Sequence, residues 1–180
     1  MKRFLATFLF VLMTIVAIAQ NSNTIKFLDI PVDGTKKEMI SKLQAKGYEY
    51  DAYSDLLFGE FNGTNVFISV QTVNNKVWRI AIVDKNINND EVDIKIRYNK
   101  LFKQLSNNSK CKVCAGSTLG EGEDISYEMD VNNKRYEAGF IFKDESINGC
   151  VWYMIVKKYG EYGIAMFYEN LNNEANGEDL

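Results

Sequence analysis

The chain has 180 residues, of which 46% are apolar and 25% charged, with one proline and 12 glycines. This composition suits a single domain with a hydrophobic core and excludes collagen-like and Pro/Gly-rich disordered chains. The net charge of −3 leaves no basic excess for a nucleic-acid partner. The sequence contains no histidine, which removes the commonest general base and the commonest transition-metal ligand. We therefore expect no metal, no cofactor and no nucleic acid.

Residues 1–19 have the pattern of a secretory signal peptide. The basic pair Lys2-Arg3 precedes an apolar run over 4–16 and the small-x-small sequence 17–19. The run is shorter than the roughly 20 residues that a membrane-spanning helix needs. No cysteine follows the cleavage site, so a lipoprotein is not indicated. We expect a periplasmic or extracellular protein that begins at Gln20, with no transmembrane segment after cleavage.

A capped helix is the first element predicted with a clear start and end. Thr35 and Glu38 have the spacing of a capping box, in which each side chain satisfies a free backbone donor of the other. Met39 and Leu43 then fall on one face, and Gly47 suits the left-handed residue that ends a helix.

Three strand-like runs follow this helix, over 56–61, 65–71 and 76–83. An Asn-Gly pair separates the first two, which is a strong signal for a tight hairpin, and an Asn-Asn pair separates the last two. Side chains alternate between two faces along the second and third runs, as strands require. These residues are expected to form an antiparallel meander.

The second part of the chain repeats this order. A helix is predicted from Asn89 or Asp90 to Asn107, because apolar residues recur on one face from Ile94 to Leu105. A cysteine-containing segment and a Gly/Glu-rich stretch over 116–124 come next. Four strands are then predicted over 125–131, 136–142, 151–156 and 162–168.

This order gives an α+β fold with two similar halves, over about 27–87 and 88–169, each with a helix packed on an antiparallel meander. The predicted sequence of elements is helix, three strands, helix and four strands. Residues 20–169 would form one domain. Residues 170–180 are polar without alternation and are predicted to be a C-terminal tail.

The three cysteines are Cys111, Cys114 and Cys150. An odd number in an exported protein leaves at least one free thiol or an intermolecular bridge. Cys111 and Cys114 have the C-x-x-C spacing, but they follow a predicted helix instead of beginning one, so structural cysteines are favoured over redox chemistry. A disulfide from Cys150 to either of the other two fits the sequence, which does not choose between them.

Carboxylates offer the main route to catalysis without histidine. Glu121, Glu123 and Asp124 cluster, followed by Glu128 and Asp130. A glycosidase needs two acids across a cleft, one with a raised pKa. These acids fall in a Gly-rich loop and on a solvent-facing strand, so a solvated acidic surface is expected. Catalytic residues are not predicted.

Calcium-like alternation of oxygen ligands occurs over 84–88 and 172–177. Neither segment has the bidentate acid that an EF-type loop requires at position 12. No metal ligand is assigned from either segment.

Aromatic residues make up 13% of the chain. Most are expected to fill the core under the helices. Trp78, Trp152 and Tyr153 are candidate binding residues on a sheet face left open by the helices, because Trp and Tyr are favoured in protein interfaces.

The stretch Ile30–Thr35, with the capped helix, Gly47 and the meander beyond, resembles small exported bacterial domains. One is the beta-lactamase-inhibitor-protein-like (BLIP-like) group, which has tandem helix-plus-sheet halves and binds a partner protein. The other is the BamE-like (SmpA/OmlA) helix-on-sheet domain of outer-membrane assembly, although the missing lipobox cysteine departs from it.

The ending over 168–180 is also similar to that of exported proteins from Bacteroides-type bacteria. The resemblance concerns layout over 27–169, and no residue role is carried over from it. It implies a two-halved fold and a protein partner.

Together these observations predict a non-catalytic binding protein of the cell envelope that docks another envelope or secreted protein through a sheet face. One alternative is a carboxylate-based hydrolase that acts on glycans, which a buried acid pair in a deep cleft would favour. The other is a structural envelope protein with no discrete site.

Overall fold

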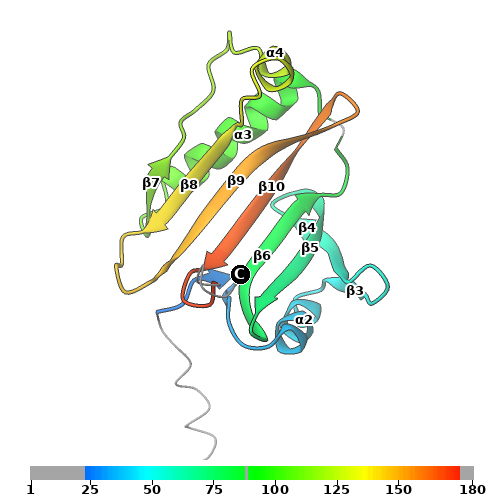
Figure 1. The fold of residues 1–180 in the computed structure, drawn as a ribbon, viewed down its shortest axis with the longest axis vertical. Helices are drawn as coiled ribbons and strands as arrows, with labels where there is room; N and C mark the ends of the chain where they lie inside the picture. The colour runs from blue at the N-terminus through cyan, green and yellow to red at the C-terminus, as the bar shows by residue number, and fades with distance from the viewer. Residues whose placement is uncertain (1–22, 88, 175–180) are drawn as a thin grey trace, which may run out of the picture.

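The computed structural model describes residues 23–87 and 89–174 (Figure 1). The predicted signal peptide over 1–19 and residues 175–180 of the predicted tail lie outside the described residues. Within these residues there are three helices and ten strands, and the strands form two antiparallel sheets. The fold is therefore α+β, as predicted.

Eight strands form one antiparallel sheet. In spatial order they are β3 (Glu49–Asp51), β4 (Leu56–Phe61), β5 (Thr64–Val73), β6 (Lys76–Asp84), β10 (Glu161–Asn170), β9 (Gly149–Lys158), β8 (Glu137–Phe142) and β7 (Cys111–Ala115). A separate two-stranded ribbon precedes them, made of β1 (Lys26–Phe27) and β2 (Ile30–Pro31).

The sheet consists of two four-stranded meanders, each preceded by a helix. Helix α2 (Lys36–Ala45) precedes β3–β6, and α3 (Glu91–Ser106) precedes β7–β10. The last strands of the two meanders pair in the centre of the sheet, where Val83 lies opposite Ala165 and Arg79 opposite Glu169 (Figure 1). The two predicted helix-on-meander halves are thus joined through β6 and β10 into one continuous sheet.

Both predicted main helices are confirmed, with their caps. The Thr35 side chain accepts a hydrogen bond from the Glu38 backbone, and Glu38 Oε2 accepts one from Thr35 N at 3.0 Å. Asp90 caps α3 by accepting a hydrogen bond from Asp93 N at 2.8 Å. These bonds satisfy donors that a helix start otherwise leaves free.

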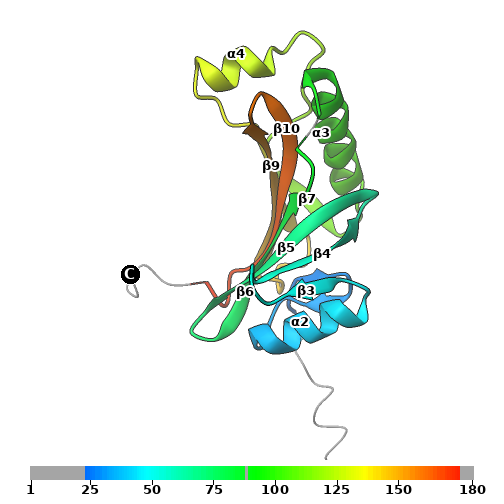
Figure 2. The same cartoon turned by 90° about the vertical axis from the view of Figure 1, so that its right-hand side faces the viewer.

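Helix α3 covers one face of the sheet (Figure 2). Tyr98 and Phe102 of α3 place their rings 4.9 and 5.6 Å from those of Tyr153 and Phe140. Residues paired directly across antiparallel strands share a face. From β4 to β8, the row that contains Tyr153 is at most 5% exposed: Leu57, Ile68, Ile82, Met166, Tyr153 and Ala138. This row belongs to a hydrophobic cluster that extends through both halves and includes Met39 and Leu43 of α2.

The segment predicted as a strand over 125–131 is a helix, α4 (Ile125–Asp130). Asp124 caps it by accepting a hydrogen bond from Tyr127 N at 2.8 Å. Ile125 is buried, whereas Tyr127 and Val131 are exposed, so the alternating apolar residues do not share a buried face. A run of seven residues is too short for its pattern alone to distinguish the period of a strand from that of a helix.

Four strands and one docked segment were not predicted, and two of the strands are those of the β1–β2 ribbon. The cysteine-containing segment is the edge strand β7, paired with β8, and β3 adds a short strand at the opposite edge. The start of the predicted tail is attached to the domain. Asn170 is buried and donates to Val32 O at 2.9 Å, and Asn173 Nδ2 donates to Val77 O at 2.9 Å. Side-chain amides therefore attach this polar segment to the domain. A pattern of hydrophobic residues cannot predict such hydrogen bonds.

Candidate functional site

An aromatic pair lies on the sheet face opposite α3, which we call the open face. Trp152 on β9 is directly paired with Phe167 on β10. Their rings stack with centroids 4.1 Å apart and planes inclined by 19°. Because side chains alternate along a strand, both rings point away from the face that carries Tyr153 and Met166.

An ion pair lies beside these rings. Glu169 follows Phe167 on the same face of β10, and its side chain is only 9% exposed. Its Oε1 lies 2.5 Å from Arg79 on the paired strand β6 and accepts a hydrogen bond of 2.8 Å from Trp152 Nε1. The carboxylate therefore fixes both an arginine and an indole.

Trp78 precedes Arg79 on β6. A β-bulge interrupts the alternation of side chains here, because Arg79 pairs with Gln71 but Val77 pairs with Thr72, so Trp78 and Arg79 share a face. The Arg79 guanidinium contacts two aromatic rings. Its central carbon is 3.9 Å from the centroid of the Trp78 ring and 5.3 Å from that of Phe167. Both distances fall within the range of cation–π attraction. We call Trp78, Arg79, Trp152, Phe167 and Glu169 the aromatic–arginine cluster. Four of its members are half-buried, and Glu169 is buried beneath them.

Small side chains surround the cluster. The row of paired residues that contains Trp152 and Phe167 continues to Ala81 and Ser69 on one side and to Gly139 on the other. None of these three side chains is large enough to cover an indole or phenyl ring. The Trp152 and Phe167 side chains are accordingly only half-buried.

The structure separates the three residues singled out from the sequence. Trp78 and Trp152 belong to the aromatic–arginine cluster. Tyr153 lies on the helix-covered face, is fully buried and donates a hydrogen bond to Tyr98 O at 3.0 Å. Burial also raises the pKa of Tyr153. We remove Tyr153 from the candidate docking residues, because a side chain inside the core cannot contact a docked protein.

Arg79, Phe167 and Glu169 were missed from the sequence. The predicted strands over 76–83 and 162–168 already place Arg79 and Phe167 on defined faces. The sequence does not show that these strands are neighbours, which requires the pairing of β6 with β10. Glu169 was missed because it falls at the boundary with the predicted polar tail.

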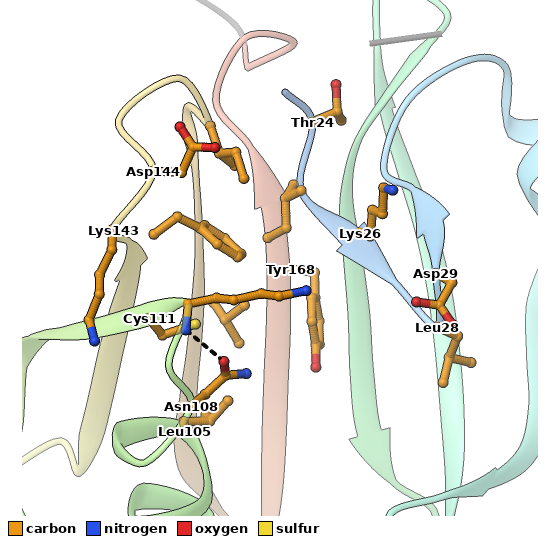
Figure 3. A pocket seen from close by; sticks show the side chains of 15 residues that line it. Thr24, Lys26, Leu28, Asp29, Leu105, Asn108, Cys111, Lys143, Asp144 and Tyr168 are labelled. Carbon is orange, nitrogen blue, oxygen red and sulfur yellow. Dashed lines mark hydrogen bonds between the residues drawn. The ribbon is translucent and has the colours of Figure 1, made fainter. Parts of the chain in front are cut away.

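All three cysteines are free thiols, and they lie on two faces of the sheet. Burial raises the pKa of Cys150 to about 12, and the neighbouring Glu169 carboxylate adds to this effect. A thiol with so high a pKa is almost entirely protonated at neutral pH and is a poor nucleophile. Cys111 is buried on the other face, where it lines a cavity of about 700 Å³ (Figure 3).

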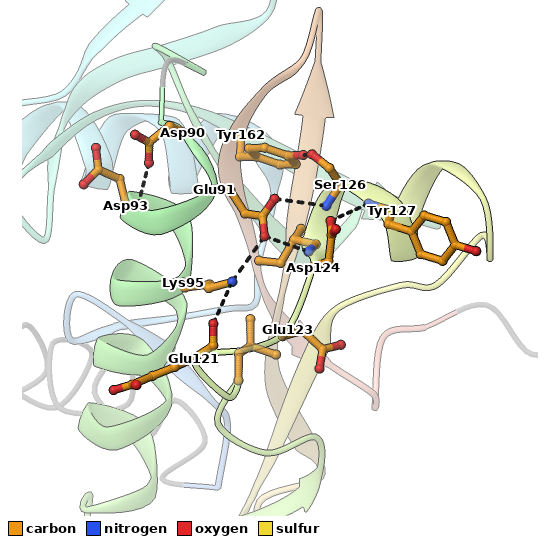
Figure 4. A network of polar contacts seen from close by, with 12 residues as sticks. Asp90, Glu91, Asp93, Lys95, Glu121, Glu123, Asp124, Ser126, Tyr127 and Tyr162 are labelled. Atoms are coloured by element: carbon orange, nitrogen blue, oxygen red, sulfur yellow. Dashed lines mark hydrogen bonds and ion pairs between the residues drawn. The ribbon is translucent and has the colours of Figure 1, made fainter.

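The acidic residues that could have formed a catalytic pair hold a loop and α4 in place (Figure 4). Glu123 pairs with Lys134 and accepts a hydrogen bond of 2.6 Å from Tyr136, and the bond from Lys134 is the largest cause that lowers its pKa. Asp124 caps α4. Glu91 of α3 accepts a hydrogen bond of 3.0 Å from Ile125 N. A general acid needs a raised pKa, and the Glu123 carboxyl has the opposite shift.

We find no protein-family model, no curated protein and no solved structure that matches the chain. Among residues 23–87 and 89–174, no group of three or more Cys, Asp or Glu side chains is arranged to hold a metal ion. None of the helices in the same residues is long and apolar enough to cross a membrane.

Proposed function

We propose that this protein is an exported, non-catalytic binding module of the cell envelope, which docks another protein through the open face of its sheet. The aromatic–arginine cluster is the observation that carries the proposal. It places two tryptophans, a phenylalanine and an arginine together on a sheet face beside small residues. Trp and Arg are the residue types that most often dominate the binding energy of protein interfaces.

The cluster is also preorganised, which favours binding. Glu169 forms an ion pair with the Arg79 head group, and the Trp78 and Phe167 rings lie within cation–π distance of it. An arginine that is already fixed loses less side-chain entropy when a partner covers it. The Trp152 ring is fixed in the same way by its hydrogen bond to Glu169 and its stack on Phe167.

The test is a pull-down from the envelope extract of the source cells, with the chain from Gln20 to Leu180 as bait. We expect one stoichiometric partner that the Trp152→Ala variant fails to retain. Loss of a central tryptophan typically removes about 2 kcal/mol, which corresponds to roughly thirtyfold weaker binding. Trp152 lies on the surface, so circular dichroism and thermal melting should show that the variant is still folded.

The matched control is Tyr127→Ala, which removes an exposed aromatic ring from α4, outside the cluster. This variant should retain the partner with unchanged affinity. Retention of the partner by folded Trp152→Ala, or its loss from Tyr127→Ala, contradicts the assignment of the open face. If no partner is captured, the proposal of a stable protein complex is wrong.

A further inference from the structure

The cavity lined by Cys111 lies where the two halves of the protein meet. Its walls come from the β1–β2 ribbon, the end of α3, the start of β7 and the loop between β8 and β9 (Figure 3). Its volume of about 700 Å³ is within the range of roughly 300–1,000 Å³ that is usual for small-molecule sites. It opens on the helix-covered side of the sheet, so it is separate from the aromatic–arginine cluster.

The inner wall of the cavity is apolar. Side chains from both halves contribute to it: Ile25, Leu105, Phe142, Ile147, Val151 and Tyr168. All six belong to the hydrophobic core or pack against it. A ligand that covers this wall would remove apolar surface from water, and burial of each methylene group strengthens binding by about fourfold.

The rim of the cavity is basic on one side. Lys110 and Lys143 lie near Cys111, and Lys26 lies on the β1 side. None of these three ammonium groups has an ion-pair partner within the described residues. Burial raises the pKa of Cys111, while the charges of Lys143 and Lys110 act to lower it. The positive potential of these two lysines therefore extends to the floor of the cavity.

Two carboxylates, Asp29 and Asp144, also line the cavity. Asp144 Oδ1 accepts hydrogen bonds from Ser146 N at 3.0 Å and from Ser146 Oγ at 2.6 Å, so it is engaged within its own loop. Asp29 lies in the β1–β2 turn, across the cavity from Lys143 (Figure 3). The lining contains three lysines and two aspartates, so its net charge is positive.

We propose that the cavity binds a fatty acid, with the alkyl chain against the apolar wall and the carboxylate between Lys110 and Lys143. The combination of an apolar wall with two unpaired lysines at the rim fits a ligand that has a long apolar body and a single anionic group. A neutral alcohol of the same length would lack the charge interaction, and an alkylammonium ion would be repelled.

Titration calorimetry with decanoate tests the proposal, with 1-decanol and decyltrimethylammonium as chain-matched neutral and cationic probes. We expect decanoate to bind more tightly than 1-decanol, and decyltrimethylammonium more weakly than either. In ¹³C-methyl spectra, decanoate should shift the resonances of Ile25, Leu105, Ile147 and Val151. Octanoate should bind more weakly than decanoate, by up to about fifteenfold for the two missing methylenes.

The double variant Lys110→Gln/Lys143→Gln tests the placement of the carboxylate. Each exposed lysine contributes about two- to fivefold to an ion pair, so decanoate affinity should fall by about tenfold, with 1-decanol unaffected. Lys112→Gln is the matched control, because Lys112 is two residues from Lys110, on β7, does not line the cavity and should leave decanoate binding unchanged. Equal affinity for the three probes, methyl shifts outside the cavity, or no binding at millimolar decanoate would overturn the proposal.

Discussion

Glu169 is the central residue of the open face, because its carboxylate holds two other members of the aromatic–arginine cluster at once. Its side chain is 9% exposed, and that of Arg79 is 24% exposed. A charge that is so little hydrated depends on its partners, and removal of one partner leaves the other insufficiently compensated. The ion pair is therefore expected to matter more for stability than an ordinary surface pair does.

A double-mutant cycle measures this dependence. Glu169→Gln and Arg79→Met should each lower the free energy of unfolding by about 1–2 kcal/mol, since each leaves one charged or polar group without its partner. The double variant should be less destabilised than the sum of the two by about 1 kcal/mol. Urea unfolding of the four proteins gives the coupling, and strict additivity would show that the two residues do not stabilise each other.

Trp152 and Tyr153 show what a single sequence can establish about individual residues. Adjacent residues on a strand point to opposite faces, so only one of the two can belong to an open face. The alternation shows that the Trp152 and Tyr153 side chains lie on opposite faces of the sheet, but it does not show which of these faces α3 covers. That choice is made by contacts between distant segments, such as the approach of the Tyr98 ring to Tyr153.

At the scale of elements, local signals were the most reliable. The capping box at Thr35, the cap at Asp90 and the turn at Asn62-Gly63 all act within four residues, and each is present in the structure. The segment over 125–131 was wrongly predicted to be a strand. Alternating apolar residues form a strand only when another strand pairs with them, and the sequence pattern does not show whether such a partner is present. In the structure that segment is α4, and β8 instead pairs with β7 and β9.

The β9–β10 hairpin has an unusual turn residue. Tyr159 and Gly160 form its two-residue loop with φ angles of +53° and +84°, a conformation that favours Asn or Asp followed by Gly. The Tyr159 side chain is 94% exposed, so its replacement removes little packing. Tyr159→Asn should raise the free energy of unfolding by about 0.5–1 kcal/mol, which thermal melting would detect.

Gly160→Ala is the contrasting variant in this hairpin. It places a Cβ at a positive φ angle and should lower stability, although nothing lies close enough to clash with the added carbon. A lower melting temperature for Tyr159→Asn would mean that the tyrosine ring stabilises the hairpin, and would contradict the expectation.

The segment around α4 should make stability depend on pH. The hydrogen bond from Lys134, together with that from Tyr136, lowers the pKa of Glu123 below its ordinary value. The folded state therefore favours the ionised form, and this stabilisation is present above about pH 4.5 and is lost as the pH falls through the lowered pKa. Glu123 is partly exposed, so the contribution should not exceed about 1 kcal/mol.

The variant Glu123→Gln isolates this contribution. It should be less stable than the unmodified protein at pH 7 and equally stable near pH 2, when urea unfolding midpoints are compared at the two values. Glu128→Gln is a control in the same segment, because Glu128 accepts its hydrogen bond from the neutral amide of Asn132. A difference for Glu123→Gln that persists at pH 2 would contradict the ion-pair explanation.

At the scale of the whole molecule, the α+β class and the two halves follow from element order, but the single eight-stranded sheet does not. The halves are joined by β6 and β10, and the pairing of Val83 with Ala165 has no local signal in either strand. Asp84 shows how this junction is specified. Its carboxylate lies 2.5 Å from Arg97 of α3 and accepts a hydrogen bond of 2.7 Å from Ile164 N, so one side chain connects β6, β10 and a helix.

The position of β10 also determines when the protein can fold. β10, the last strand of the described residues, lies between β6 and β9, and the bond from Ile164 N to Asp84 closes a loop of 80 residues. Such long-range pairing makes folding slow, and the two meanders cannot join until the last strand has been synthesised. A nascent chain without β10 would have two unconnected sheet edges and no complete core. For a protein that is exported as proposed, this delay would keep the polypeptide unfolded, and therefore able to pass through a translocation channel, until β10 has been synthesised.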